Sequence, residues 1–240
     1  MRNFSFNGIT KNYITVLSSN RLPWAPIERE YQEVPNRPGA YTKKKRKTKP
    51  RPFPITVLLE ADGVNLQKLK EDFASWLIHD EPKPLIPDDE PDRTYYAVVD
   101  GSFDPEELVN FGQGVIPFIC PDPYKYGEEK TVTLGTGSIN NAGTAETTPI
   151  INVTFTAAAS EYKITHQESG GFVRVIWNFV AGDKLVIDLA KRKIIINDNV
   201  NMTAYYWRNR PFMLRPGANN LTVVPASVAT TLIKFRPRWK

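Results

Sequence analysis

The stretch AGDKLVIDLAKRKIIIND, residues 181–198, decides how the second half of this chain folds. Its two apolar runs, KLVIDL and KIII, alternate with polar residues, and the polar groups AGD and AKRK bound them as turns. Alternation with a period of two, bounded by turn residues, is typical of β-strands that bury one face. The stretch therefore predicts a hairpin or a meander that packs against one core.

Further short runs of the same kind surround this hairpin. They are divided by polar, glycine-containing segments, and no helical period lies between them: TPIINVTF, YKITHQ, FVRVIWNFV, NLTVVP and TLIKFRP. Short strands at such spacing indicate a β-sandwich or a jelly roll. We expect Trp177 to lie in the core of this domain and His166 to lie at its surface or half-buried.

The first half combines strands with one helix. Its strand-like runs are FPITVLLEA (53–61), TYYAVVDGSF (94–103) and GVIPFIC (114–120). Between the first two runs, NLQKLKEDFASWLI places apolar residues at helical spacing, which predicts one amphipathic helix at about residues 65–79. Asn65 is a suitable N-cap, and Pro82 prevents the helix from continuing beyond about Asp80.

The composition changes near PDPYKYGEEK, residues 121–130. Fifteen of the twenty prolines precede position 124, and five are spread over the remaining 117 residues. We therefore expect a mainly β protein of two domains, an N-terminal β domain with one helix at 1–128 and a C-terminal β-sandwich at 129–240.

Several kinds of site find no support in the sequence. A lone Cys120 and two distant histidines give no zinc pattern. No nucleophile with a histidine partner and no glycine-rich phosphate loop is present, and Asp183 with Asp188 is better explained as turn and strand-edge acids. We expect no enzyme activity and no cofactor. The N-terminal residues lack the apolar core of a signal peptide, so we expect assembly inside the cell without membrane insertion.

A basic run is the main charge feature of the chain. Seven Lys and Arg residues lie between Lys43 and Arg51, whereas the first 129 residues together carry 17 basic and 20 acidic side chains. A duplex-binding domain is usually basic over a wide stripe, so this pattern argues against general nucleic-acid binding. Flanking prolines and a glycine predict that residues 40–52 form an exposed loop or hairpin arm. The candidate assembly residues are Lys43, Lys44, Lys45, Arg46 and Lys47.

An acidic segment follows the basic run. Residues 80–107 contain ten Asp and Glu side chains against Lys83 and Arg93. Copies of a chain with a basic arm and an acidic belt can dock head to tail, and they form a ring where the rotation closes. Two solvated loops that never meet explain the same pattern equally well.

An aromatic group, TAYYWRNRPF, offers a different kind of site. Tyr205, Tyr206 and Trp207 are candidates for a platform on which a sugar ring stacks. Packing in the core or at a sheet edge is the simpler explanation, because large aromatic side chains are usually buried first.

Several short motifs follow one another along nearly the whole chain. They are FNGI, VPNRPGAY, a helix ending in WL, PDRTYYAVVDG, GVIPFICPDPYKYG, NNAGTAETTPIINV and PFMLRPGANNLTV. In this order they resemble the distal tail protein family of siphophages. The segment from PDRTYYAVV to ICPDPYKYG, together with NAGT and LRPGxNxL, is the most specific part of the resemblance.

The resemblance implies a structural hub at the tip of a long non-contractile phage tail. Its N-terminal domain would be related to tail-tube proteins and would assemble as a hexameric ring, with two rings back to back in isolation, and its C-terminal domain would be a galectin-like β-sandwich. The ring would join the tail tube to tail-associated adhesion or fibre proteins and leave a channel for DNA. The family supplies no catalytic residues.

The motif residues are interpreted as architecture. Gly39, Gly143 and Gly217 are expected at tight or left-handed backbone positions. Pro121 and Pro123 would stiffen the connector between the domains. The alternative function is a carbohydrate-binding module that recognises host cell-wall glycans through the aromatic group.

Overall fold

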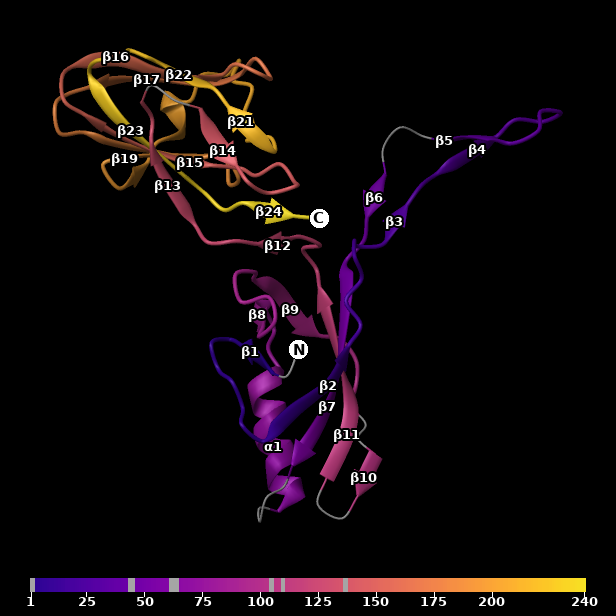
Figure 1. The fold of residues 1–240 in the computed structure, drawn as a ribbon. Helices are drawn as coiled ribbons and strands as arrows, with labels where there is room; N and C mark the ends of the chain where they lie inside the picture. The colour runs from indigo at the N-terminus through magenta and orange to yellow at the C-terminus, as the bar shows by residue number, and fades with distance from the viewer. Residues whose placement is uncertain (1–2, 43–45, 61–64, 104–105, 109–110, 136–137) are drawn as a thin grey trace. The chain divides into compact units, whose positions relative to one another are not determined.

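The computed structural model of the chain describes residues 3–42, 46–60, 65–103, 106–108, 111–135 and 138–240. These residues form β-strands with one α-helix, which confirms the predicted mainly β fold class (Figure 1). The chain divides into two compact units, residues 1–126 with Lys240 and residues 127–239.

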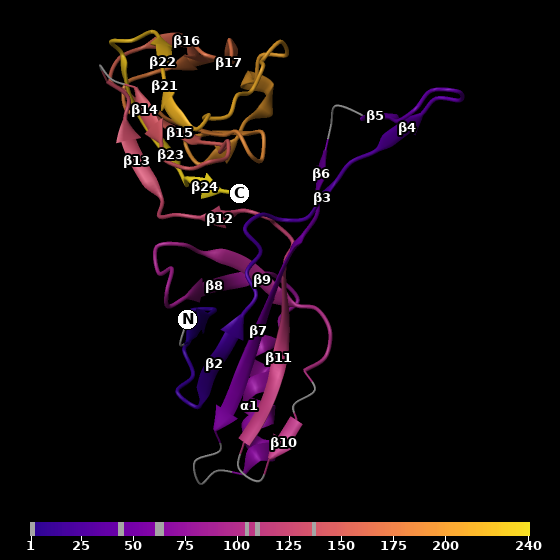
Figure 2. The ribbon, with the colours of Figure 1, turned by 45° about the vertical axis from the view of Figure 1, so that its right-hand side comes forward.

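Two long strands, β7 and β11, form the centre of the first unit. Ten antiparallel rungs join β7 (Arg51–Glu60) to β11 (Phe111–Cys120), and the strands run side by side in Figures 1 and 2. Alternate residues of β7 are buried, as the period of two in FPITVLLEA requires. The sheet order is β1-β8-β9-β11-β7-β2, with β10 beside β11. The other strands are β1 (Phe4–Phe6), β2 (Ile14–Ser19), β8 (Lys83–Pro87), β9 (Tyr95–Val99), β10 (Glu106–Leu108) and β12 (Lys125–Tyr126).

The helix α1 (Leu66–Leu77) packs an aromatic core against these strands. Asn65 caps the helix, since its side-chain oxygen accepts a hydrogen bond from Gln67 N at 2.8 Å. Trp76 stacks on Phe4 with ring centroids 5.5 Å apart, and its indole Nε1 donates to Phe6 O at 3.0 Å. The polar edge of this buried tryptophan is thus satisfied, while its rings fill the core.

The second unit is a β-sandwich. One sheet has the strand order β13-β23-β15-β18-β19-β20, a second has the order β17-β16-β22, and β14 pairs with β21. A single cluster of buried side chains from these strands forms the core, in which Phe155 and Phe179 stack at 4.0 Å. The strands are β13 (Lys130–Thr133), β14 (Ile139–Asn141), β15 (Ile150–Phe155), β16 (Ala159–His166), β17 (Gly171–Phe179), β18 (Lys184–Asp188), β19 (Lys193–Ile196), β20 (Asn199–Val200), β21 (Gly217–Asn219), β22 (Leu221–Val224), β23 (Ala229–Phe235) and β24 (Arg238–Trp239), with a 3₁₀ turn at Met202–Ala204.

The predicted hairpin at 181–198 is confirmed as β18 and β19, which pair from Leu185–Ile196 to Asp188–Lys193. Its acids have the turn roles expected of them. Asp183 accepts from Val180 N, and Asp188 accepts from Lys191 N, each at 2.9 Å.

Two predictions about single residues in this unit are wrong. Trp177 is 38% exposed, because a bulge of β17 opposite β16 breaks the alternation and leaves three successive side chains, Ile176 to Asn178, outside. His166 is fully buried instead of lying near the surface.

The three motif glycines lie where side chains are poorly tolerated, as predicted. Gly39 and Gly217 have φ values of 83° and 87°. A Cβ on Gly143 would lie 2.4 Å from Arg238 O. Of the helices in the described residues, none is long and apolar enough to cross a membrane.

Candidate assembly site: the hairpin arm

The described residues between β2 and β7 form one long hairpin that continues their ladder outward. Successive rungs stay close to one register, as the pairs Ile14–Leu59, Ser19–Ile55, Ile27–Thr48, Tyr31–Thr42 and Glu33–Ala40 show. We call residues 27–48 the hairpin arm, which contains β3 (Ile27–Glu28), β4 (Tyr31–Glu33), β5 (Ala40–Thr42) and β6 (Lys47–Thr48). Of the candidate assembly residues, Arg46 and Lys47 are on its returning side, and Lys43, Lys44 and Lys45 lie outside the described residues.

The tip of the arm is a tight turn. Arg37 N donates to Val34 O at 3.2 Å, and the left-handed conformations of Asn36 (φ 64°) and Gly39 turn the chain back. The motif VPNRPGAY therefore encodes the end of the arm.

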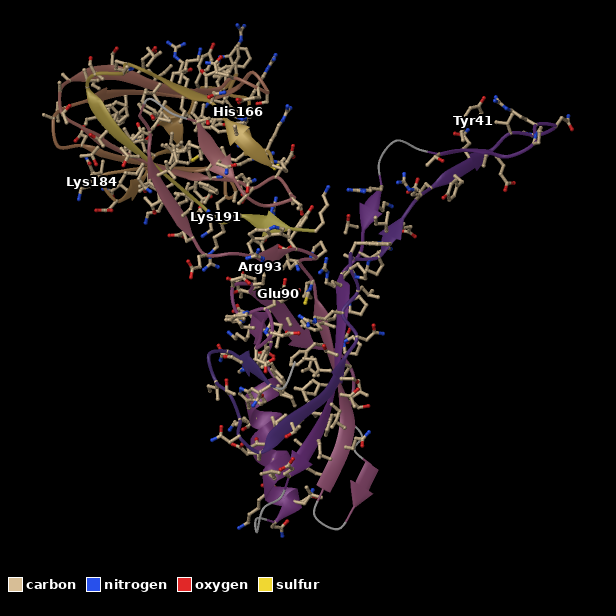
Figure 3. The ribbon with its side chains drawn as sticks, in the orientation of Figure 1. Tyr41, Glu90, Arg93, His166, Lys184 and Lys191 are labelled. Carbon is tan, nitrogen blue, oxygen red and sulfur yellow. The ribbon has the colours of Figure 1, made fainter. Side chains whose placement is uncertain are left out.

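The arm carries apolar side chains that nothing in its own unit covers. Every residue of its four strands is exposed, including Tyr31 (64%), Tyr41 (51%) and Ile27 (40%). Tyr41 is labelled in Figure 3, and the guanidinium of Arg37 lies 4.5 Å from its ring centroid. A two-stranded ribbon without a core is marginally stable alone, so this surface is suited to pack against another protein.

The basic charge of the arm is partly balanced by acids on the opposite strand. Lys47 Nζ lies 3.0 Å from Glu30, and Lys49 Nζ lies 2.9 Å from Glu28. The hydrogen bond from Lys49 lowers the pKa of Glu28 below its ordinary value. The run is therefore less positive toward a partner than the sequence of residues 43–51 suggests.

The prediction that the whole run is exposed is wrong at its last residue. Arg51 is 4% exposed, because β7 begins there and pairs with Cys120 of β11. Among the described residues it is the one buried Lys or Arg.

The acidic belt is also partly neutralised inside its unit. Arg21 pairs with Asp89 and lies 3.5 Å from Glu90. Glu90, labelled in Figure 3, also accepts from Lys125 Nζ at 2.5 Å and from Tyr95 Oη at 2.8 Å. The hydrogen bond to Glu90 and burial together raise the pKa of Tyr95, with burial the larger cause.

The aromatic group in the second unit does not form a flat platform. Tyr205 packs against the core, and its backbone bridges to Val175 of β17. Tyr206 and Trp207 have ring centroids 6.2 Å apart at an angle of 52°. Trp207 is 76% exposed, but the guanidinium of Arg208 lies 4.4 Å from the centroid of its ring. The guanidinium of Arg174 lies 5.0 Å from the ring centroid of Tyr206 in the same way.

A buried polar cluster that the sequence did not indicate lies around His166, which is labelled in Figure 3. His166 Nδ1 is 2.7 Å from Ser169 Oγ, and His166 Nε2 is 3.0 Å from both Asn219 Oδ1 and Glu168 Oε2. The ring stacks on Phe212 and is sealed from solvent, so the imidazole itself is not open to a ligand, and the cluster joins loops of the sandwich. The motif LRPGANN marks Asn219, but no local pattern indicates its partner 53 positions away.

Two family models match most of the chain. Residues 6–120 match the phage tail protein RIFT-related domain, and residues 142–239 match the C-terminal domain of the siphovirus-type tail component.

Comparisons with individual proteins agree with these matches. The chain is 30% identical to the distal tail protein of Bacillus phage SPP1 over 190 residues. This alignment covers 76% of this chain and 74% of the SPP1 protein. The crystal structure of the SPP1 Dit protein is similar to the present fold with a TM-score of 0.86, at 20% identity and over 99% of each chain. The chain therefore belongs to the siphovirus distal tail protein family.

Proposed function

We propose that this chain is a structural hub at the tip of a siphophage tail, assembled from copies of the chain as a hexameric ring. The N-terminal domain, residues 1–128, forms the ring, and the C-terminal domain, residues 129–240, is a galectin-like sandwich. The ring joins the tail tube to tail-associated adhesion or fibre proteins and leaves a channel for DNA. Its assembly takes place in the host cytoplasm, and its role involves no catalysis.

The exposed apolar surface of the hairpin arm carries this proposal. Tyr31, Tyr41 and Ile27 lie on a ribbon without a core, which is an unfavourable arrangement for an isolated subunit. The ribbon gains a hydrophobic partner if it lies against a neighbouring copy, and repetition of such a head-to-tail contact closes into a ring. The similarity to SPP1 Dit, which is described as a paradigm of hub adsorption apparatus, supports the same role.

The experiment is a measurement of the native mass by light scattering, with negative-stain images of the main peak. We expect a hexamer or two stacked hexamers with a central hole. The double variant Tyr31→Ser, Tyr41→Ser should shift the mass toward the monomer, because it removes the apolar face of the arm. Trp207→Ser is the matched control, since it removes a more exposed aromatic side chain from the second unit.

The salt dependence of ring formation distinguishes the apolar contribution to the contact from the charged contribution. Replacing residues Lys43 to Lys47 by Ser should weaken the ring more at low than at high salt, because screening removes charge pairs at high salt. A wild-type chain that remains monomeric at all concentrations, or a ring that tolerates both arm variants, would contradict the proposal.

Carbohydrate binding is a second proposal, favoured by the 76% exposure of Trp207. A sugar ring would stack on Trp207, with Tyr205 and Tyr206 beside it, after Arg208 moves from the indole face. Glycan arrays and pulldown of host cell wall with the full chain test it against Trp207→Ala. Absence of binding at millimolar sugar concentrations would dismiss this function and leave the hub unaffected.

A further inference from the structure

A buried arginine without full pairing lies at the root of the hairpin arm. Arg51 is 4% exposed, and its Nε and Nη2 atoms have no hydrogen-bond partner among the described residues. Burial removes the hydration of a guanidinium, and this cost is offset only when acceptors replace the lost water. In the isolated subunit, two of the nitrogen atoms of Arg51 lack that replacement.

Arg51 lines a pocket of about 280 Å³ in the first unit. The pocket has apolar and aromatic walls, which include Trp24, Ala25, Pro123 and Tyr124. Arg46 and Lys240 bring further basic side chains to it. No Asp or Glu of the described chain is among the lining residues. A positively charged pocket with apolar walls suits a carboxylate on an apolar stem, because a guanidinium binds a carboxylate through two parallel hydrogen bonds.

The acid next to the pocket in sequence is already engaged. Asp122 precedes the lining residues Pro123 and Tyr124, and its carboxylate accepts hydrogen bonds from Tyr124 N and Tyr126 Oη. Asp122 is therefore not free to pair with Arg51.

We propose that a carboxylate side chain from a neighbouring copy of this chain enters the pocket and pairs with Arg51. Arginine and tryptophan are the residues most often found at the energetic centre of protein interfaces, and Trp24 at this pocket is 62% exposed. The same unit offers suitable acids on its surface, such as Glu81, which is 84% exposed and lies 3.8 Å from Lys83. The proposal rests on the assembly of copies proposed above and assigns one polar contact within it.

The test compares Arg51→Met with the matched variant Arg46→Met, which removes an exposed cation from the same pocket. Arg51→Met should leave the unfolding midpoint of the dissociated chain unchanged or raise it, because it replaces an incompletely paired buried charge by an apolar side chain of similar length. It should nevertheless weaken association by about tenfold or more, since it removes a central contact. Arg46→Met should change association less.

A small probe tests the pocket without assembly. Millimolar glutarate, compared with chloride at equal ionic strength, should raise the unfolding midpoint of the dissociated wild-type chain and leave that of Arg51→Met unchanged. No effect of glutarate on the wild type overturns the carboxylate site. Equal association of wild type and Arg51→Met overturns the neighbouring copy as its source. The wild type could also remain dissociated while glutarate still raises its unfolding midpoint through Arg51. That result would overturn both the proposed ring and the neighbouring copy as the source of the carboxylate, but it would support the carboxylate site itself.

Discussion

His166 Nε2 donates its hydrogen bond to Asn219 Oδ1 over 3.0 Å inside the second unit. The amide group of Asn219 fixes the direction of this bond. Its Nδ2 donates to the backbone carbonyls of Ile139, Arg215 and Gly217, so the atom that faces His166 is the oxygen Oδ1, which can only accept. The imidazole therefore carries a proton on Nε2, and its Nδ1 lies 2.7 Å from the hydroxyl oxygen of Ser169. One asparagine thus ties together the end of β16, the start of β14 and Gly217 at the start of β21.

Asn219→Ala should destabilise the chain by about 2 to 4 kcal/mol, because several buried polar groups lose their partner at once. Chemical unfolding of the second unit, followed by the fluorescence of its tryptophans, measures the change. Asn140→Ala is the matched control, since Asn140 lies on β14 but is exposed, and it should change stability by less than about 0.5 kcal/mol. Equal effects of the two substitutions would show that the Asn219 network contributes little.

The strands of the second unit were predictable because each carries its own signal in consecutive residues. The turn acids Asp183 and Asp188 mark the two ends of β18, and the alternation between them indicates a strand with one buried face. The burial of His166 carries no such signal, because its acceptor is supplied by Asn219 from a distant part of the chain. Periodicity reports local geometry, and it does not report which remote group satisfies a buried polar side chain.

The hairpin arm was predictable in kind but not in detail. The prolines and glycine near residues 35–39 indicate a turn, and the density of Lys and Arg indicates exposure. The pairing of Lys47 with Glu30 depends on the register of the hairpin, and the burial of Arg51 depends on where the arm ends and β7 begins. Neither the register nor that boundary can be read from composition.

Gly143→Ala should destabilise the chain by about 1 to 3 kcal/mol. The added Cβ would meet the backbone of Arg238, with O at 2.4 Å and N at 2.7 Å, and a paired backbone cannot move aside as a flexible side chain can. Thermal unfolding of Gly143→Ala and Gly135→Ala makes the comparison, because a Cβ at Gly135 would contact nothing within 4 Å. A Gly143→Ala chain as stable as wild type would mean that the loop shifts freely.

Asp72→Asn should lower stability at neutral pH, with a loss below about 1 kcal/mol because the group is solvated. Hydrogen bonds from Lys11 Nζ at 2.7 Å and Tyr13 Oη at 2.5 Å hold the pKa of Asp72 below its ordinary value. A lowered carboxyl pKa stabilises the fold above the unfolded-state pKa of about 3.9, and this contribution is lost as the pH falls through the lowered value. Urea unfolding from pH 7 to pH 2 should therefore show the two chains converging in acid. Glu71→Gln changes the neighbouring exposed acid of α1 and should follow the wild type throughout.

The wild-type chain should bind DNA weakly, whereas the variant Glu28→Gln, Glu30→Gln should bind it more tightly. These two acids pair with Lys49 and Lys47, so their removal leaves the cations of the arm available to phosphates. The gained affinity should fall steeply with salt, because each phosphate contact releases counterions. Fluorescence anisotropy with single- and double-stranded DNA at low and physiological salt measures both effects. Glu81→Gln provides the control for net charge, since it removes an exposed acid far from the arm in sequence. Tight, salt-sensitive binding by the wild type itself would contradict this prediction and make the arm a nucleic-acid contact.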